Sequence, residues 1–232
     1  MSSTARDQIL ARIRAATQAA GDPAGRDADA EYAALPRRYL RAHHDAAAHD
    51  IAALFAERAA DYRAVVERVP GPGLATAVAR VLAARVAAVP GPVLAPDGLP
   101  AGWLAGLAAG ITLARDEPPL SAAELDRAAG VVTGCAVAVA ETGTIILDHG
   151  PGASGQGRRA LTLVPDFHLV IVRAGQVAAD LADAFARLDP DRPHTLISGP
   201  SATSDIELIR VEGVHGPRTL HVLLAHPDQG DA

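Results

Sequence analysis

The chain has 232 residues, which is enough for one large α/β domain, or for such a domain with a helical extension, and for a sizeable buried core. Hydrophobic residues make up 49% and charged residues 21%, a balance that is typical of a soluble globular protein and not of a disordered one. The formal net charge is −6 and no arginine-rich run forms a basic patch, so we expect no nucleic acid among the partners.

The first 62 residues are predicted to form a helical arm and linker. One helix is expected over Thr4–Ala20, where Gly and Pro follow, and a second over Asp45–Tyr62. Residues 21–36 between them contain little apolar sequence and are interpreted as a linker. The apolar stripes of both helices need a surface to cover, either on the chain's own domain or on a second copy of the chain in a homodimer.

From residue 63 to residue 232, short β-rich runs alternate with alanine-rich helices. Most of the runs are continuously apolar, which is typical of strands that are buried on both faces. This alternation predicts a three-layer α/β domain with a mainly parallel sheet. The expected strands are Ala64–Val69, Val93–Ala95, Ile111–Ala114, Ala136–Ala140, Thr144–Leu147, His168–Arg173, Thr195–Ser198 and Thr219–Leu224. The expected helices are 73–88, 100–108, 121–128, 175–188 and 203–209.

Glu141, Thr142 and Gly143 lie in a tight turn between two neighbouring apolar strands. A carboxylate at such a place is costly to bury unless it is paired or used, and burial suits it to act as a general base or a nucleophile. The turn therefore predicts a catalytic role for Glu141, with Thr142 and Gly143 beside a ligand. The alternative is a structural role, in which Glu141 accepts hydrogen bonds from turn amides or from Arg158 or Arg159.

The richest polar segment runs from Ile197 to Glu207, where an apolar strand leads into a hydroxyl-rich turn and a predicted helix. Such a turn places free backbone amides at the carboxyl edge of a parallel sheet, where a phosphate or a carboxylate can bind. The alternative is helix initiation alone, because Ser204 and Glu207 have the spacing of a capping box. The candidate ligand-binding residues of this segment are Gly199, Ser201, Thr203 and Asp205.

Two histidines are candidates for the same site. His168 opens a buried strand, and a histidine there either acts as an acid, a base or a ligand, or is a hydrogen-bonded structural residue. His215 follows the polar segment and can return to the same edge of the sheet, so we predict that it serves catalysis with Glu141. We expect Glu141, Ser201, Thr203, Asp205 and His215 to approach one another at one edge of the sheet, although Glu141 is far from the others in sequence.

No intrinsic cofactor or metal is expected. Cys135 is the only cysteine, so the chain cannot form an intrachain disulfide or hold an iron–sulfur cluster by itself. The chain has no lysine, which excludes a P-loop lysine, and it has no Gly-x-Gly-x-x-Gly fingerprint. Its histidines lack the spacing of a helical zinc motif. With no apolar leader and no membrane span, a cytoplasmic protein is expected.

Four motifs stand in a distinctive order, namely Ala140–Ile145, Leu163–His168, Gly199–Glu207 and Gly213–Pro217. In the order and spacing of these motifs the chain resembles the lactate utilization protein C family, the stand-alone LUD domain. The resemblance implies a fold like that of the NagB/RpiA/CoA-transferase superfamily. It also implies a role in oxidising L-lactate to pyruvate, alongside partner proteins that carry cysteine-rich and iron–sulfur modules.

Two classes of function remain open at this stage. In the first, the chain is a subunit of a lactate-oxidising system that binds a small carboxylate or phosphate, and its partners hold the iron–sulfur clusters. In the second, it is a free-standing enzyme that acts on an acyl-thioester, a sugar phosphate or a folate-like ligand, with Glu141 as nucleophile or base. The second class draws on a likeness of fold, because class I CoA-transferases use a Glu in a Glu-x-Gly turn and Glu141-Thr142-Gly143 looks similar.

Overall fold

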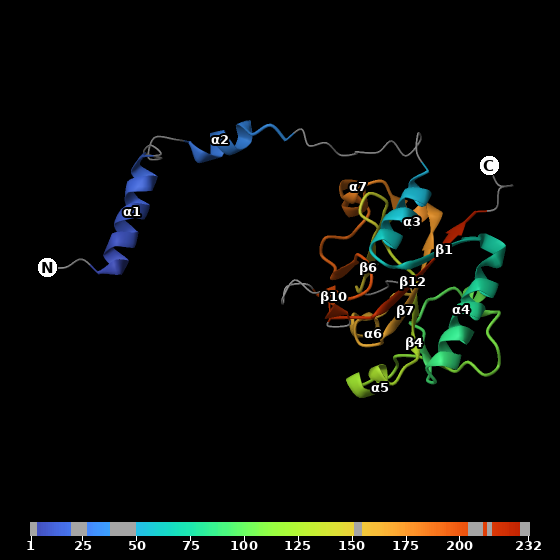
Figure 1. The fold of residues 1–232 in the computed structure, drawn as a ribbon. Helices are drawn as coiled ribbons and strands as arrows, with labels where there is room; N and C mark the ends of the chain where they lie inside the picture. The colour runs from blue at the N-terminus through green and yellow to red at the C-terminus, as the bar shows by residue number, and fades with distance from the viewer. Residues whose placement is uncertain are drawn as a thin grey trace. The chain divides into compact units, whose positions relative to one another are not determined.

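A computed structural model describes residues 4–19, 27–37, 50–150, 155–203, 211–212 and 215–227. The chain divides into two compact units, Met1–Leu40 and Arg41–Ala232. Each unit is described by itself below, and Figure 1 shows the elements of both.

The first unit contains two helices, α1 (Ala5–Ala19) and α2 (Ala28–Ala34). Helix α2 lies inside the segment that we predicted to be a linker. It forms because the Asp27 side chain caps it, accepting hydrogen bonds from the amides of Asp29 and Ala30. In α1, Ile9 and Ile13 are exposed, so α2 does not cover the apolar stripe of this helix within the first unit.

The second unit is built on a six-stranded sheet in which every neighbouring pair of strands is parallel. This confirms the predicted α/β class with a mainly parallel sheet. The four-residue strand β4 is one that the sequence reasoning missed. In spatial order the strands are β1 (Val65–Pro70), β12 (Thr219–His226), β7 (Phe167–Arg173), β4 (Gly130–Thr133), β2 (Val93–Leu94) and β3 (Leu113–Ala114).

Three of the expected strands leave this sheet and form a second one. The turn at residues 140–143 makes β5 and β6 antiparallel neighbours, as its shortness predicted, and β9 then pairs antiparallel with β6. A hairpin of this kind cannot join a parallel sheet through consecutive strands, so a separate four-stranded sheet results. Its order is β8 (Val177–Ala178), β5 (Val137–Val139), β6 (Thr144–Asp148) and β9 (His194–Ile197).

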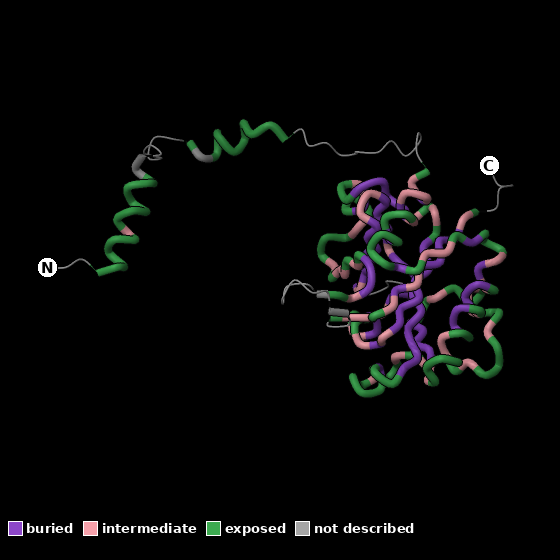
Figure 2. Tube along the Cα trace, viewed as in Figure 1, coloured by how far each residue is buried: buried purple, intermediate pink, exposed green. Residues whose placement is uncertain are grey.

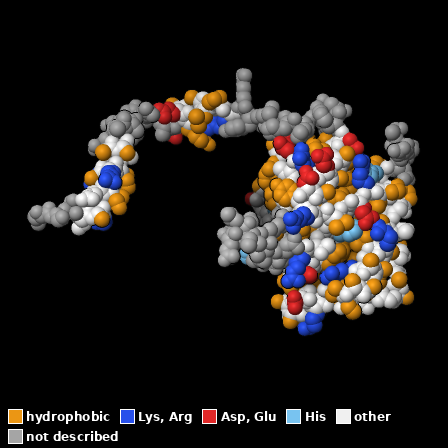
Figure 3. Space-filling view, viewed as in Figure 1, with side chains coloured by type: hydrophobic (Ala, Val, Ile, Leu, Met, Phe, Trp, Pro, Cys, Tyr) orange, Lys and Arg blue, Asp and Glu red, His pale blue; other side chains and the backbone are white. Residues whose placement is uncertain are grey.

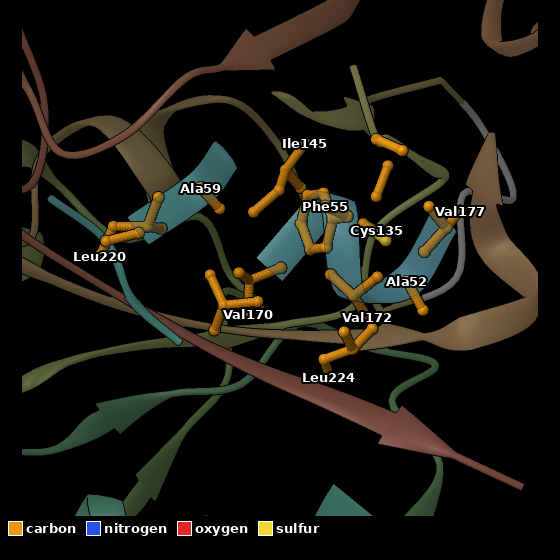
Figure 4. Close-up of a cluster of buried hydrophobic side chains, with 14 of the residues drawn as sticks. Ala52, Phe55, Ala59, Cys135, Ile145, Val170, Val172, Val177, Leu220 and Leu224 are labelled. Carbon is orange, nitrogen blue, oxygen red and sulfur yellow. The ribbon is translucent and has the colours of Figure 1, made fainter. Parts of the chain in front are cut away.

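The two faces of the parallel sheet are covered by different layers. Its inner strands β12, β7, β4 and β2 are largely buried, whereas its edge strands β1 and β3 are partly exposed (Figure 2). Helix α4 (Leu74–Ala88) packs on one face through Val78 and Leu82. The second sheet and helix α3 (Ile51–Asp61) pack on the other face, where Phe55 lies among Val170 and Leu224 (Figure 4). We placed α3 in the arm, with its boundary at residue 62, whereas α3 contributes to the core of the second unit.

The remaining elements are short. The helix expected over 175–188 shrinks to α7 because Val177–Ala178 pairs with β5. Of the helix expected over 203–209, Thr203 belongs to a strand instead, and 204–209 lie outside the described residues. These elements are η2 (Gly71–Gly73), η3 (Ala101–Leu104), α5 (Ala122–Asp126), α6 (Ala160–Leu163), η4 (Ala174–Gln176), α7 (Leu181–Ala186), β10 (Ala202–Thr203) and β11 (Val211–Glu212).

Candidate functional site

A cavity of about 280 Å³ brings together four of the predicted site residues, His168, Gly199, Ser201 and His215. We call it the strand-start cavity because His168 and Leu220, which line it, are the second residues of β7 and β12. Its other lining residues come from α6, from β9 and from the turns that follow β9. They are Arg159, Thr162, Leu163, Thr195, Leu196, Ile197, Ser198, Pro200, Ala202, Gly216 and Pro217.

The position of this cavity corrects one expectation. We expected the hydroxyl-rich turn after β9 to lie at the carboxyl edge of the parallel sheet, and it lies beside the amino ends of β7 and β12 instead. The reason is that β9 belongs to the second sheet and runs antiparallel to β6. The end of β9 is therefore not an end of the parallel sheet.

His168 is fully buried at the base of the cavity. Its Nε2 lies 2.7 Å from the Thr133 hydroxyl, which is also fully buried. Its Nδ1 is buried and has no hydrogen-bond partner among the described residues. Desolvation lowers the pKa of His168 to about 3, so the imidazole is neutral near pH 7. An unpaired buried nitrogen is costly, and His168 lines the cavity, so a ligand that penetrates as far as the ring would supply the missing partner.

Ser201 connects the turn at Gly199 with the turn at Gly216 and Pro217. Its amide donates to the Pro217 carbonyl oxygen at 2.8 Å, and its hydroxyl accepts a hydrogen bond from the His215 amide at 3.0 Å. These contacts hold the Gly199–Ser201 turn against the Gly216–Pro217 turn and place both on the cavity wall.

The end of α3 braces the two turns that carry the candidate residues. Gly199 has a φ of +83°, and a Cβ there would lie 2.4 Å from the Tyr62 carbonyl oxygen. Gly143 has a φ of +62°, and a Cβ there would lie 2.5 Å from the Ala59 amide nitrogen. Only glycine satisfies both demands, which explains why each turn contains one.

A chain of hydroxyl groups links the Glu141 turn to the cavity. The Thr142 hydroxyl lies 2.7 Å from that of Thr144, which lies 2.8 Å from that of Ser198 on the cavity wall. Glu141 itself is half-buried, and its amide donates to the Ala179 carbonyl oxygen. Of the residues that the structure describes, neither Glu141 nor Gly143 lines the cavity.

The other sequence-predicted residues are placed less fully. Thr203 is the last residue of β10, and Asp205 lies outside the described residues, as do Ser204 and Glu207. Arg158, one of the two arginines considered as partners of Glu141, binds Asp116 instead, with Nε 2.6 Å from a carboxylate oxygen.

The sequence reasoning missed a histidine–threonine pair beside the cavity. His149 Nδ1 lies 2.7 Å from the Gly157 carbonyl oxygen, so in the neutral ring Nδ1 carries the proton and donates it. His149 Nε2 then accepts a hydrogen bond from the Thr195 hydroxyl at 2.8 Å. Thr195 lines the cavity, and its oxygen is left to accept a hydrogen bond from a ligand. The only signal in the sequence was a histidine directly after a strand.

The charge of the cavity favours an anion. Arg159 lines it, and none of the described lining residues is an aspartate or a glutamate. The neutral imidazole of His168 and the hydroxyls of Thr195, Ser198 and Ser201 provide donors and acceptors around the same space. A small carboxylate or phosphate fits this arrangement of groups.

A metal or thiolate centre has no support in the described part of the chain. No three His, Cys, Asp or Glu side chains gather there in a way that would hold a metal ion. Burial raises the pKa of the Cys135 thiol to about 12, so this group stays protonated near neutral pH.

Comparison with known proteins places the chain in a family. It is 50% identical over 176 residues to a lactate utilization protein C of Deinococcus radiodurans, an alignment that covers 73% of this chain and 77% of that one. The chain belongs to the lactate utilization protein C family. A lactate utilization protein C of Exiguobacterium is 35% identical over 97 residues, covering 38% of this chain and 40% of its own.

The LUD domain family matches residues 119–225, which include β4 through most of β12 and thus the strand-start cavity. A crystal structure of a DUF162 family protein from Deinococcus radiodurans has the same fold, with a TM-score of 0.60 and 41% sequence identity. The match covers 76% of this chain and 96% of that one. In the part of the present chain that the structure describes, no helix is long and apolar enough to cross a membrane.

Proposed function

We propose that this protein serves lactate utilization and binds a small 2-hydroxy carboxylate in the strand-start cavity. The name of the 50% identical relative from Deinococcus radiodurans supports the process. The assignment of a ligand rests on the buried His168 Nδ1, which has no hydrogen-bond partner among the described residues. This nitrogen belongs to a cavity that Arg159 lines and that has no acidic residue among its described lining residues.

The groups of the cavity match the parts of L-lactate. Arg159 and the hydroxyls of Ser198 and Ser201 suit the carboxylate, because charge-assisted hydrogen bonds to it are strong. The Thr195 oxygen, whose proton is directed to His149, suits the hydroxyl of a 2-hydroxy acid as a hydrogen-bond acceptor. His149 can take up a proton from that hydroxyl by way of Thr195.

The proposal extends to partners. The single cysteine, Cys135, is buried with its thiol protonated, so the electron-transfer centres are assigned to cysteine-rich and iron–sulfur partner proteins. In this arrangement the chain supports oxidation of L-lactate to pyruvate by holding the carboxylate, and a partner accepts the two electrons and the hydrogen of C2, while the hydroxyl proton passes to His149. The alternative with Glu141 as nucleophile has less support, because Glu141 does not line the cavity in the part of the chain that is described.

Two measurements test this proposal. Calorimetric titration of the isolated chain with L-lactate, pyruvate and inorganic phosphate measures binding, and Ser201→Ala is expected to weaken carboxylate binding about threefold to tenfold. Ser121→Ala is the matched control, because Ser121 caps α5 and its loss lowers stability without touching the cavity. Reconstitution with candidate partners then measures lactate-dependent electron transfer. Absence of carboxylate binding, or turnover of an acyl-thioester by the chain alone, would contradict the proposal.

A further inference from the structure

A second and larger cavity, of about 630 Å³, lies at the opposite edge of the parallel sheet. We call it the strand-end cavity, because Arg173 and His226, which line it, are the last residues of β7 and β12. Gly71, directly after β1, lines it too, so three neighbouring strands end at this place. Open parallel sheets bind ligands at this edge.

The side chain of Arg173 is held in a fixed orientation. Its Nε donates to Gln176 Oε1 at 3.2 Å, and the Arg173 amide donates to the same oxygen at 3.1 Å. The other end of the Gln176 amide group is fixed as well, since Nε2 donates to the Cys135 carbonyl oxygen at 2.6 Å. Gln176 thus links the arginine to the buried segment between β4 and β5.

Arg173 forms no ion pair with any described residue, whereas Arg68 and Arg80, on or near strand β1 of the same sheet, are paired with Asp50 and Glu67. It is exposed at the cavity, and no described lining residue is acidic. An oriented guanidinium without a counter-ion is suited to bind a carboxylate or a phosphate.

A second donor lies on the neighbouring strand. His226 Nε2 accepts a hydrogen bond from Arg68 Nε at 2.9 Å, which leaves the ring proton on Nδ1. Burial and the charge of Arg68 lower the pKa of His226, so its ring is neutral near pH 7. Beside it α4 begins at Leu74 without a side-chain cap, and the amides of this first turn add positive potential.

The remaining wall of the cavity is largely apolar. Trp103 and Leu74 both line it, and the Trp103 ring packs over Gly134, where a Cβ would lie 3.7 Å from the ring. An indole face offers a stacking surface to a planar ring.

We propose that the strand-end cavity binds an organic anion whose phosphate or carboxylate is carried on a planar ring system. The anionic group binds Arg173, and the ring lies against Trp103. The class includes nucleotides and aromatic acids, and it differs in size and apolar content from the 2-hydroxy acid assigned to the strand-start cavity. This inference is independent of the proposed function, since the two cavities share none of their described lining residues.

The test uses the fluorescence of Trp103, which is the only tryptophan of the chain and lines this cavity. The full-length protein, excited at the long-wavelength edge of the tryptophan band, is titrated with AMP and with benzoate, and with adenosine, benzyl alcohol and inorganic phosphate as probes that lack either the charge or the ring. We expect saturable changes for at least one of the two ring-bearing anions, with a Kd of about 1 mM or tighter, and binding at least tenfold weaker for its matched uncharged probe.

Variants assign the effect to the guanidinium. Arg173→Gln is expected to weaken binding of that anion at least tenfold, and Arg173→Lys to restore part of it. Arg187→Gln is the matched control, because Arg187 pairs with Asp183 on α7 and lines neither cavity. We expect Ser201→Ala to leave the fluorescence titration unchanged. We likewise expect Arg173→Gln to leave L-lactate binding, measured by calorimetry, unchanged. No saturable change with either ring-bearing anion, or equal affinity of wild type and Arg173→Gln, would overturn the inference.

Discussion

The strand-start and strand-end cavities lie at opposite edges of one parallel sheet, and different parts of the chain build them. The strand-end cavity is formed largely by residues at or just after the ends of β1, β7 and β12, so its charged group comes from the parallel sheet itself. The strand-start cavity takes its hydroxyls from β9 and the turn that follows, in the second sheet and beyond. Its integrity therefore depends on contacts between layers.

On the face of the second unit that Figure 3 shows, acidic and basic side chains are interspersed over the described residues. Substitutions in the layers that pack behind each cavity can separate the two cavities experimentally.

Truncation of the core side chain of α3 is expected to have the largest effect. Phe55→Ala removes a fully buried ring from the layer that covers the second-sheet face, and we expect the free energy of unfolding to fall by about 3–5 kcal/mol. Because α3 braces the turns at Gly143 and Gly199, carboxylate binding in the strand-start cavity should weaken as well.

Urea denaturation and calorimetry at low temperature measure both effects of Phe55→Ala. Leu82→Ala on α4 is the matched control, since Leu82 is fully buried on the opposite face of the sheet. It should destabilise the protein by about 2–5 kcal/mol and spare carboxylate affinity in the folded fraction. Equal loss of affinity in both variants would show that the two faces act together.

Substitution of one glycine at each edge of the sheet allows a direct comparison of the two edges. Gly199→Ala introduces a side chain at a φ of +83° and 2.4 Å from the Tyr62 carbonyl oxygen, so we expect a loss of about 2 kcal/mol or more in the free energy of unfolding. Gly175→Ala, in the turn after β7, meets nothing within 4 Å and should change stability by about 0.5 kcal/mol or less. Thermal unfolding distinguishes them, and similar melting temperatures would contradict the bracing of the Gly199 turn.

The buried imidazole of His168 predicts how stability depends on pH. Its pKa in the folded state is about 3, below the ordinary value of 6.5, so the unfolded chain binds more protons. Its contribution to stability is complete above pH 6.5 and is lost as the pH falls toward 3. His168→Gln should reduce the slope of unfolding free energy against pH in this window by up to about 1.4 kcal/mol per pH unit.

The control for this slope is His215→Gln, which also removes one imidazole, but from an exposed position. Denaturant midpoints measured at several pH values give both slopes. A slope in His168→Gln that equals the wild-type slope would show that His168 is not a buried neutral group in the folded protein.

The smallest expected effect concerns the hydroxyl of the ligand. Thr195→Val removes the oxygen that His149 orients, and it should weaken L-lactate about threefold to tenfold while leaving propionate, which lacks the hydroxyl, nearly unchanged. Thr195→Ser should restore the preference for L-lactate. Competition titrations measure the ratio of the two affinities, and an unchanged ratio would remove Thr195 from the site.

The sequence predicted those features that depend on local pattern. The apolar run at His168–Arg173 identified a buried strand, and the short turn at Glu141–Gly143 predicted neighbouring strands. The four-residue strand β4 was missed because it follows a helix signal closely and carries no turn of its own.

The candidate site was predictable only in part, because its geometry depends on which strands pair. His168, Gly199, Ser201 and His215 were found as polar residues beside apolar runs, and the cavity brings them together. The contact between His149 and Thr195 arises from the register of β6 and β9, which no local pattern contains. Because β9 pairs with β6, the turn after β9 lies at the amino edge of the parallel sheet and not at the carboxyl edge, where we expected it.

The central claim is that the unpaired nitrogen of His168 meets a carboxylate ligand in the strand-start cavity, and side-chain nitrogen NMR tests it most directly. In protein with ¹⁵N-labelled histidine, the Nδ1 resonance of His168 is assigned by its loss in His168→Gln and followed during titration with L-lactate at pH 7. We expect a saturable shift of this resonance that is weakened in Ser201→Ala. An Nδ1 resonance that stays unchanged up to saturating L-lactate would contradict it.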